Sequence, residues 1–551
     1  MSSDLDTTLA YHQSTKHHFG RYARGPYRLD WATQPDPFRR YRGAPLRPLD
    51  HPDPGDSPPY DALFGSGEVP PRPPDRRAIS HLFYDSLALA AWKQAGGMRW
   101  ALRVNPSSGN LHPTEGYLLS GPVEGLLDSA FVAHYAPREH ALEIRAEVPA
   151  STWQALAAGL PPQAALVGLT SIYWREAWKY GERAFRYCHL DVGHAIAALA
   201  LAAAGLGWRA ALLDAVSTEQ IAGLLGVDVA PGSAEREHAD CLLALVPRQS
   251  GLMSPRLSAA AMGEFPRLDW QGTPNVLSRG HVDWPAIDEV RAATRKPPAE
   301  GVYEAAAARV PAWPAPGGAP RAASLREIVR RRRSAVALDP QATIGRDAFF
   351  HILHRLLPAQ DDPPFDALPW APAVHLVLFV HRVDGLAPGL YCLVRDPEQM
   401  GDLRAAMRGD FEWAVPDGAP AGLPLYRLLA GDARDAARQL SCQQEIASDG
   451  LFAAAMIARF APPLQRLGAW FYRRLYWECG AVGQMLYLEA EAAGVRGTGI
   501  GCFFDDPVHD LLGLTGPAAE LPAYQSLYHF TVGHPVEDAR LTTLPGYPDT
   551  R

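Results

Sequence analysis

The sequence predicts an α+β fold made of two tandem copies of one domain, each a mainly antiparallel sheet flanked by helices. Three observations support this prediction. Residues 179–228 align without a gap on residues 466–515, at an offset of 287 residues. Short apolar runs of strand length are mixed with helices, and few regular β-α-β units occur. One long apolar helix is expected in each copy, near 182–206 and 472–493, so the copies should pack as a pseudo-dimer through these central helices.

The two copies share residues at matching positions, but each lacks a segment that the other has. The shared positions of the first copy, Gly181, Arg186, Gly193, Leu199, Gly207 and Arg209, recur in the second as Gly468, Arg473, Gly480, Leu486, Gly494 and Arg496. A repeat of this length is a whole domain. The second copy has a glycine run at 497–501 that the first copy lacks, and the first has a polar loop at 105–115 that the second lacks. Complementary losses in a fused pair predict one composite site.

Composition indicates a globular protein without a nucleic-acid or membrane partner. The 551 residues suffice for two domains, and 47% hydrophobic with 20% charged residues is an ordinary balance. A net charge of −8 gives no reason to expect nucleic-acid or anionic-membrane binding. We expect a soluble cytoplasmic protein, because the N-terminus lacks a signal core and the apolar run near 195–206 is too short to span a bilayer. The six cysteines form no CxxC pair, so no metal site is expected.

Proline and glycine divide the chain into four parts. Residues 1–76 are rich in proline and arginine, which predicts an extended arm that wraps the surface. The first domain is expected at 77–250 and the second at 323–551. The connection at 251–322 has linker composition, although Trp284 and Trp313 predict that parts of it pack.

The expected elements repeat in the same order in both domains. In the first domain we expect a helix at 80–94, the long helix at 182–206, and strands at 114–120, 130–135, 142–147, 166–174 and 240–246. In the second we expect helices at 324–332, 346–356 and 472–493, and strands at 374–381, 389–394, 451–460 and 528–533. The long helix of the first copy is apolar on nearly every face, which predicts burial on all sides, and its alanines and glycines should let a partner helix approach closely.

The first segment that can carry chemistry is the polar loop Pro-Ser-Ser-Gly-Asn, from Pro106 to Asn110. Ser107, Ser108 and Asn110 present short polar groups, while Gly109 allows a close backbone approach. This combination suits hydrogen bonding to the edge of a flat polar ring. The same residues also favour a turn at the entry to a strand, so the loop alone leaves both possibilities open.

The second segment is a run of three arginines that precedes Ser334. An arginine such as Arg332 makes planar, charge-assisted contacts to phosphate, and the Ser334 hydroxyl can add another. The first copy has no such run before its first helix. The alternative is a solvated basic face of a helix, which is the commoner fate of such a run.

The third segment is a glycine-rich stretch after the second long helix, and it consists of Arg496, Gly497, Thr498, Gly499, Ile500 and Gly501. Glycines there should leave free amide groups and room for a phosphate against the backbone. The stretch is not a dinucleotide-binding fingerprint, because it follows a helix and not a strand. Its loss from the first copy favours a functional role over a structural turn.

A fourth feature is the adjacent pair Lys179 and Tyr180, which the second copy replaces with Arg466 and Leu467. Two groups that can exchange a proton suit dehydrogenation, provided that burial or a neighbouring charge brings a pKa towards neutrality. The alternative is a surface lysine beside a packing tyrosine. Other candidates for shaping a substrate pocket are His112, Glu115, Arg183, Arg186, Tyr187 and His194.

Together these segments resemble the FMN-dependent nitroreductase superfamily, in a tandem, fused form nearest the SagB-type azoline (thiazoline and oxazoline) dehydrogenases. The resemblance covers roughly residues 80–250 and 320–540, and it implies two nitroreductase-like domains in one chain in place of the family's homodimer. It implies that the polar loop meets the flavin, that Arg332 and Ser334 contact its phosphate and ribityl chain, and that the glycine stretch lies nearby. Val336 stands where a second basic residue is usual, which should weaken the phosphate contact.

The resemblance also implies a function. Lys179 and Tyr180 correspond to a pair that removes a proton while the flavin accepts hydride, so the leading hypothesis is azoline-to-azole dehydrogenation of a small or peptide-borne heterocycle, with O2 or another acceptor reoxidising the flavin. One alternative is an NAD(P)H-dependent reductase of nitroaromatics, quinones or enones. Another is a degenerate, non-catalytic flavin-binding scaffold that partners a biosynthetic cyclisation enzyme. One FMN per chain is expected, in a monomer that acts as a pseudo-dimer.

Overall fold

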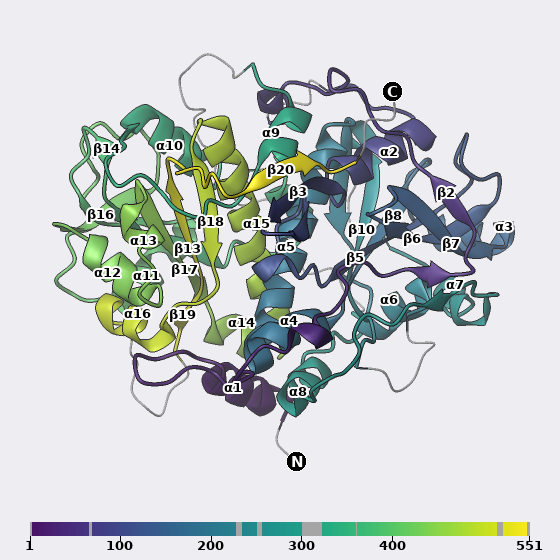
Figure 1. Ribbon diagram of the computed structural model, residues 1–551, viewed down its shortest axis with the longest axis horizontal. Coiled ribbons are helices and arrows are strands. Elements are labelled where there is room, and N and C mark those ends of the chain that lie inside the picture. The colour runs from purple at the N-terminus through teal and green to yellow at the C-terminus, as the bar shows by residue number, and fades with distance from the viewer. Residues whose placement is uncertain are drawn as a thin grey trace.

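Two similar lobes meet along a central pair of helices in the computed structural model of the chain (Figure 1). The structure describes residues 3–64, 69–227, 234–250, 256–299, 322–359, 361–514 and 522–547. Each lobe is built around one antiparallel sheet with helices against it, so the predicted α+β fold with two antiparallel domains is confirmed.

The two sheets have the same strand order. The first runs β2 (Leu46–Pro48), β7 (Ala141–Val148), β6 (Ala130–Ala136), β5 (Thr114–Ser120), β8 (Ala165–Ser171), β10 (His238–Pro247) and β9 (Trp208–Leu212). The second runs β16 (Leu425–Ala430), β15 (Gly389–Leu393), β13 (Val374–Val380), β17 (Phe452–Arg459), β19 (Tyr524–Gly533) and β18 (Arg496–Ile500). The sheets differ at one edge, where the N-terminal arm adds β2 to the first. The interiors of the central strands are almost wholly buried, as strands covered by helices must be.

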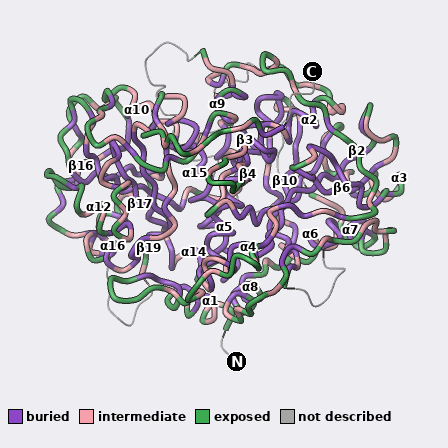
Figure 2. Tube along the Cα trace, in the orientation of Figure 1, coloured by how far each residue is buried: buried purple, intermediate pink, exposed green. Residues whose placement is uncertain are grey.

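The central helices are α5 (Ala184–Ala204) and α15 (Phe471–Ala492), and every residue of α5 is buried. They cross where Gly193 meets Gly480. A Cβ on Gly480 would stand 2.2 Å from the carbonyl oxygen of Leu190, and a Cβ on Gly193 would stand 2.2 Å from that of Trp477. Only glycine permits this approach of the two backbones. The prediction of a buried helix pair between the repeats is confirmed (Figure 2).

The repeat extends to the shorter helices. An offset of 287 residues carries α6 (Thr218–Leu225) onto α16 (Asp505–Leu512), and α4 (Tyr173–Tyr180) onto the position of α14 (Ala461–Leu467). Further helices are α2 (Arg76–Tyr84), α3 (Ala150–Ala157), α7 (Ala259–Met262), α8 (Pro285–Ala293), α9 (Leu325–Arg331), α10 (Arg346–His354), α11 (Met400–Ala406), α12 (Arg434–Leu440) and α13 (Ile446–Asp449). Outside the two main sheets, β1 (Tyr41–Arg42) pairs with β11 (Thr273–Pro274), and β12 (Ile344–Gly345) pairs with β14 (Val383–Asp384).

The expected helix at 80–94 is wrong in its second half. The helix α2 ends at Tyr84, and the chain then forms a hairpin of β3 (Leu89–Ala95) and β4 (Met98–Arg103). Gly96 and Gly97 adopt positive φ values of 53° and 82° at its tip, so the Gly-Gly pair was a hairpin signal. The strand β20 (Thr542–Pro545) returns from the second lobe and pairs with β3 (Figure 1, in yellow). The C-terminal segment thus joins the two repeats.

Two further expectations need correction. The strand expected at 166–174 ends at Ser171, and α4 begins at Tyr173. The glycine-rich stretch is not a loop after a helix but the edge strand β18, in which Gly497 pairs with Val532 and Gly499 with Phe530. Its hydrogen-bonding edge towards β19 is occupied by the sheet.

The N-terminal arm begins with a helix that the sequence prediction missed, α1 (Asp4–Ser14). Ser3 caps it, because its hydroxyl accepts the backbone N–H of Asp6 while the Asp6 carboxylate accepts the N–H of Ser3. The arm then runs along both lobes. His12 of α1 hydrogen bonds Tyr472 at 3.1 Å in the second lobe, and β2 pairs with β7 in the first.

Part of the connection between the repeats packs against the arm. The helix α8 lies beside α1, and the Trp284 ring lies 5.6 Å from the Arg24 guanidinium carbon. Residues 251–255 and 300–321, which include Trp313 and most of the proline-rich linker sequence, lie outside the described residues. Among the described residues, the helical stretch Tyr173–Ala204 has the length and composition of a membrane span, and its most apolar 18-residue window is fully buried inside the protein (Figure 2).

Candidate functional site between the repeats

A cavity with a volume of about 290 Å³ lies between the two repeats. That volume is near the lower end of small-molecule sites, which are roughly 300–1,000 Å³. The first repeat contributes Lys93, Trp100, Leu102, Arg103, Pro106, Ser107, Ser108, Gly109, Asn110, His112, Asp191 and His194. The second contributes Arg332, Arg333, Ser334, Ala335, Val336, Tyr487, Thr498, Gly499, Gly501, Tyr528 and Leu541.

The structure brings together most of the residues that sequence analysis assigned to a cofactor. The cavity is lined by Pro106, Ser107, Ser108, Gly109, Asn110, Arg332, Ser334, Thr498, Gly499 and Gly501. Arg496, Gly497 and Ile500 do not line it, because residues of β18 face different sides. The Arg496 guanidinium pairs with Glu537 at 2.9 Å, the Gly497 carbonyl accepts the N–H of Ala335, and Ile500 packs in the core of the second lobe.

Two arginines, Arg332, which is buried, and Arg333, which is partly buried, give the cavity its positive charge. The Arg332 side chain is 3% exposed, and it donates to the carbonyl oxygen of Arg103 at 3.0 Å. Arg333 donates to the carbonyl oxygens of Arg330 and Arg332 at 2.8 and 2.6 Å. Within the described residues neither guanidinium has a carboxylate partner, and the Nε atom of each has no hydrogen-bond partner. Burial lowers the pKa of Arg332, and burial together with the Arg332 charge lowers the pKa of Arg333 to about 9.

Buried charges of this kind are costly unless an opposite charge or good hydrogen bonds compensate them. The residues of the cavity therefore fit an anionic group such as a phosphate. Lys93 adds another positive charge to the lining, and burial lowers its pKa from the ordinary value. The helix expected at 324–332 ends one residue earlier, at Arg331, and Arg332 is its C-terminal cap. Arg333 and Ser334 follow the helix and line the cavity.

A chain of hydrogen bonds fastens the arginine-serine segment to β18. The hydroxyls of Ser334 and Tyr487 lie 2.9 Å apart, and the Tyr487 hydroxyl accepts the backbone N–H of Gly499 at 2.9 Å. The Thr498 hydroxyl donates to the carbonyl oxygen of Ala335 at 2.8 Å. The Gly499 amide is therefore not free for a ligand, contrary to the prediction from the glycine run.

Aromatic side chains explain the glycines instead. A Cβ on Gly499 would stand 1.8 Å from the hydroxyl oxygen of Tyr528, and a Cβ on Gly501 would stand 2.4 Å from the Tyr187 ring. His194 lies against the Tyr528 hydroxyl at 3.3 Å and against Gln484 at 3.2 Å. Burial lowers the pKa of His194 to about 3, so its imidazole is neutral at physiological pH. Gly499 of β18 thus makes room for Tyr528, which lines the cavity, and Gly501, just after β18, makes room for Tyr187.

The polar loop is held from behind by two helices. Ser107 donates to the Glu176 carboxylate at 3.3 Å and accepts the N–H of His112 at 2.8 Å, while the Ser108 N–H donates to Asp191 at 3.3 Å. Gly109 has a φ of +62°, and a Cβ there would stand 2.8 Å from the Tyr180 hydroxyl and 3.0 Å from the Lys179 Nζ. A glycine is needed both for this backbone conformation and for this space.

Lys179 and Tyr180 accordingly lie against the loop, and neither is among the residues that line the cavity. The Tyr180 ring packs against the Tyr187 ring, with 4.7 Å between centroids. Burial, with a smaller contribution from the nearby Glu176 charge, raises the pKa of Tyr180 well above its ordinary value. Its phenol therefore stays protonated at neutral pH and can donate a proton but not accept one.

Sequence reasoning missed several cavity residues. Asp191 is the acidic residue of α5, whose buried residues are mostly apolar, and that contrast was the signal that could have singled it out. In the sequence, Tyr487 and Tyr528 look like ordinary core aromatic residues. Leu541 lines the cavity because it directly precedes β20, the C-terminal strand that pairs with β3 of the first repeat. Of the alternative pocket residues, His112 and His194 line the cavity, whereas Arg183 and Arg186 pair with Asp505 and hold the arm.

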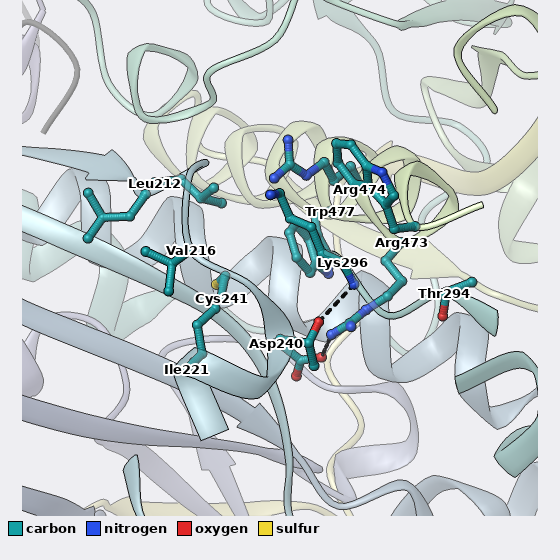
Figure 3. Close-up of a pocket in the computed structure, with 13 residues that line it drawn as sticks. Leu212, Val216, Ile221, Asp240, Cys241, Thr294, Lys296, Arg473, Arg474 and Trp477 are labelled. Carbon is teal, nitrogen blue, oxygen red and sulfur yellow. Dashed lines mark hydrogen bonds and ion pairs between the residues drawn. The ribbon is translucent and has the colours of Figure 1, made fainter. Parts of the chain in front are cut away.

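The equivalent position on the other side of the pseudo-dimer is filled. The offset of 287 carries Gly499, Gly501 and Tyr528 back onto Leu212, Asp214 and Cys241. Around these residues the Asp214 carboxylate pairs with Arg474, and Lys296 lies 5.1 Å from the Trp470 ring. Figure 3 shows Leu212, Cys241, Lys296 and Arg474 at this position. The space left there is about 10 Å³, and a neighbouring space beside Glu478 is about 30 Å³. Neither can hold more than about one or two waters.

Comparison with known proteins identifies the fold. Residues 86–244 match the model of the Nitroreductase family. No curated protein sequence matches the chain. The crystal structure of a candidate nitroreductase from Anabaena variabilis is similar over 96% of this chain and 99% of its own, with a TM-score of 0.68 and 22% identity.

Two weaker similarities concern shorter stretches. A chain of the E. coli microcin synthetase McbBCD complex aligns with 33% of this chain and 65% of its own, with a TM-score of 0.26 and 19% identity. A candidate nitroreductase from Ralstonia eutropha aligns with 40% of this chain and 96% of its own, with a TM-score of 0.26 and 15% identity. The chain thus has a nitroreductase-like fold along nearly its whole length, with a Nitroreductase family domain at residues 86–244.

Proposed function

We propose that the chain is an FMN-dependent oxidoreductase with a single composite FMN site, the cavity between its two repeats. The observation that supports this most is a pair of arginines that line a ligand-sized cavity, the buried Arg332 and the partly buried Arg333. Neither has a carboxylate partner among the described residues. A phosphate would supply the missing negative charge. The Nitroreductase family match and the fold raise the expectation of a flavin at this place.

The other residues of the cavity fit the rest of FMN. Ser334 and Thr498 carry hydroxyls that can reach a polyhydroxylated chain, and the polar loop with Ser108 and Asn110 suits the polar edge of a flavin ring. Tyr528 and Trp100 provide flat apolar surface. When bound, FMN supplies an acceptor for a hydride, which is two electrons and one proton. The protein's part is to bind, to exclude water and to handle the proton.

The reaction that we propose is the dehydrogenation of a small or peptide-borne heterocycle of the azoline type to the azole. Its support is the position of Lys179 and Tyr180, whose polar atoms lie against Gly109 of the loop at the cavity. A proton acceptor must lie within hydrogen-bond reach of the substrate, directly or through a water. A heterocycle of this kind is made by a cyclisation reaction, so the partner that we propose is the enzyme that performs it.

The second candidate runs the redox reaction in reverse. An NAD(P)H-dependent reductase of nitroaromatics, quinones or enones would use the same flavin site. The match of residues 86–244 to a family named for nitro-group reduction favours it.

One experiment separates these candidates. The purified protein, loaded with FMN, is mixed anaerobically with a thiazoline compound or with NADPH, and the flavin absorbance is followed. Bleaching by the thiazoline supports the dehydrogenase, and bleaching by NADPH alone favours the reductase. If FMN binds but is bleached neither by the thiazoline nor by NADPH, the result favours a non-catalytic scaffold. A protein that cannot be loaded with FMN contradicts the proposal as a whole.

The Lys179→Ala variant tests the assigned proton acceptor. We expect a loss of turnover of about 100-fold or more with FMN still bound, because general acid–base groups contribute roughly 10²–10⁴-fold. Lys296→Ala is the matched control, since Lys296 lies at the filled equivalent position and should leave turnover unchanged. Unchanged turnover in Lys179→Ala would remove the lysine from the mechanism.

A further inference from the structure

Two acidic side chains lie buried behind the polar loop, and the proposed function has not used them. Glu176 on α4 is fully buried and Asp191 on α5 is 2% exposed, and Asp191 lines the cavity. Each uses one carboxylate oxygen to hold the loop, at 3.3 Å from the Ser107 hydroxyl and 3.3 Å from the Ser108 N–H. The other oxygens, Glu176 Oε2 and Asp191 Oδ2, have no hydrogen-bond partner.

The surroundings do not compensate two negative charges. The groups that act on this pair are Lys179, Tyr180, Cys188 and Tyr528, and only Lys179 is a cation. No arginine within the described residues forms an ion pair with either carboxylate. Two buried carboxylates that act on each other cannot both ionise at modest cost, so one proton stays with the pair. Burial raises the pKa of Asp191 to about 8, and burial with the Asp191 charge raises that of Glu176.

We propose that Glu176 and Asp191 share one proton at neutral pH and that this pair exchanges a proton with Lys179 during turnover. The second half of this inference rests on the proposed function, whereas the first half does not. The Lys179 Nζ lies against Gly109, at the loop that both carboxylates hold. The lysine therefore lies at the same loop as the carboxyl pair, and its charge acts on Glu176.

The proton balance of the proposed oxidation is simple. The substrate loses a hydride, which carries both electrons to the flavin, and one proton, which stays with the protein. As Lys179 takes that proton, a proton of its ammonium passes to the singly charged pair, which becomes neutral. When a two-electron acceptor such as dioxygen later takes the hydride, it also needs one proton to become hydrogen peroxide, and the pair can return it. Glu176 and Asp191 thus act through Lys179 and are positioning residues.

The shared proton is measurable without turnover. A carboxyl group whose folded pKa is raised binds its proton in the folded state at pH values where the unfolded chain has lost it. The free energy of unfolding therefore falls as the pH rises from the pKa of the unfolded chain, near 4, to the pKa of the folded protein. For each proton that only the folded state binds, the equilibrium constant for unfolding rises about tenfold per pH unit. We expect the double variant Glu176→Gln with Asp191→Asn, which removes both carboxyl groups, to lose this slope between about pH 5 and pH 7 relative to the wild type.

The comparison includes a control and a second measurement. Glu182→Gln, on the segment that follows α4, should keep the wild-type slope because Glu182 lies outside the pair. Parallel profiles of the wild type and the double variant would overturn the shared proton. If the double variant does not fold, infrared spectroscopy of the wild type serves. A protonated-carboxyl band that persists at pH 7 supports the pair, and absence of the band at pH 7 overturns it.

The exchange with Lys179 has its own readout. In Asp191→Asn loaded with FMN, we expect the pH profile of kcat to shift by one pH unit or more, and in Asp191→Glu, which restores a carboxyl group, we expect the wild-type profile. Turnover with an unchanged profile in Asp191→Asn and Glu176→Gln would overturn the exchange. If the wild type turns over none of the substrates but shows the proton slope, the proposed function fails and the carboxyl pair stands.

Discussion

Arginines that are buried or partly buried fall into two kinds in this protein, those paired with a carboxylate and those that line the cavity. Arg183 and Arg186 share the carboxylate of Asp505, at 2.9 and 2.7 Å, and together they fix the N-terminal arm. Arg332 and Arg333 have no carboxylate among the described residues and face a cavity. The first kind is explained within the fold. We propose that a bound anion compensates the second kind.

The Arg332→Met variant tests this assignment. Because a charge-assisted hydrogen bond to phosphate contributes about 1.5–3 kcal/mol, FMN should bind roughly 10- to 150-fold more weakly, as measured by calorimetry. Riboflavin, which lacks the phosphate, should bind equally to the variant and the wild type. Arg331→Met is the control, since the Arg331 side chain is 62% exposed and pairs with Glu327. An equal loss for FMN and riboflavin would contradict the phosphate contact.

The cysteines allow a second test at this scale. The Cys442 thiol and the His17 ring hydrogen bond to Cys502 and lower the pKa of its thiol to about 5, whereas burial raises the pKa values of Cys188, Cys241, Cys392 and Cys479. Because the thiolate is the nucleophile, iodoacetamide at pH 6 should modify Cys502 first. Peptide mapping by mass spectrometry checks this order, and earlier labelling of Cys442 would contradict it.

Sequence reasoning reached some of these residues and not others, for physical reasons. Ser334 and Gly109 stand in short local patterns, and such patterns are visible in one dimension. Glu176 and Asp191 are acidic residues on helices whose residues are mostly buried. That the two carboxyl groups are buried behind the same loop depends on how α4 and α5 pack. Pairing across elements has no local pattern, so the carboxyl pair could not be predicted.

At the scale of elements, the glycines of the central helices set the geometry of the whole site. Gly193 and Gly480 let α5 and α15 cross at backbone contact, and Asp191 and Tyr487 are carried by these same helices. A change in the crossing would move the two halves of the cavity apart. The elements themselves were largely predictable, because long apolar helices and short buried strands have strong periodicity.

The Gly480→Ala variant tests the crossing. Its Cβ would stand 2.2 Å from the carbonyl oxygen of Leu190, so the helices must separate. We expect the free energy of unfolding to fall by about 1–3 kcal/mol, the usual cost of overpacking. Gly401→Ala in α11, where a Cβ would meet nothing within 4 Å, is the control and should not destabilise. Equal stability of Gly480→Ala and the wild type in denaturant titrations would contradict the close crossing.

Two elements near the site escaped prediction because tertiary pairing decides them. The stretch Leu89–Ala95 has helix-forming alanines, yet it is a strand because β4 and β20 flank it. The glycine run is a strand because it pairs with β19, and its glycines serve Tyr528 and Phe530. In both places the partner strand overrides local propensity, as it commonly does for β-structure.

At the scale of the molecule, the two equivalent positions between the repeats differ. The cavity combines the polar loop of one repeat with the arginine-serine segment of the other, whereas the equivalent position is filled by Arg474, Lys296 and Trp470. We propose that only the cavity is a cofactor site. The arm, the tail strand β20 and the central helices all tie the repeats together. Fusion allows such asymmetry, because each half can change independently, whereas a homodimer must change both sites at once.

The amount of flavin per chain tests this account most directly. The protein is saturated with FMN, freed of excess by gel filtration and denatured, and the released flavin is quantified by absorbance against the protein concentration. The account predicts a ratio close to one. A ratio close to two would show that the second position also binds the cofactor, and a ratio close to zero would show that the cavity between the repeats is not a flavin site.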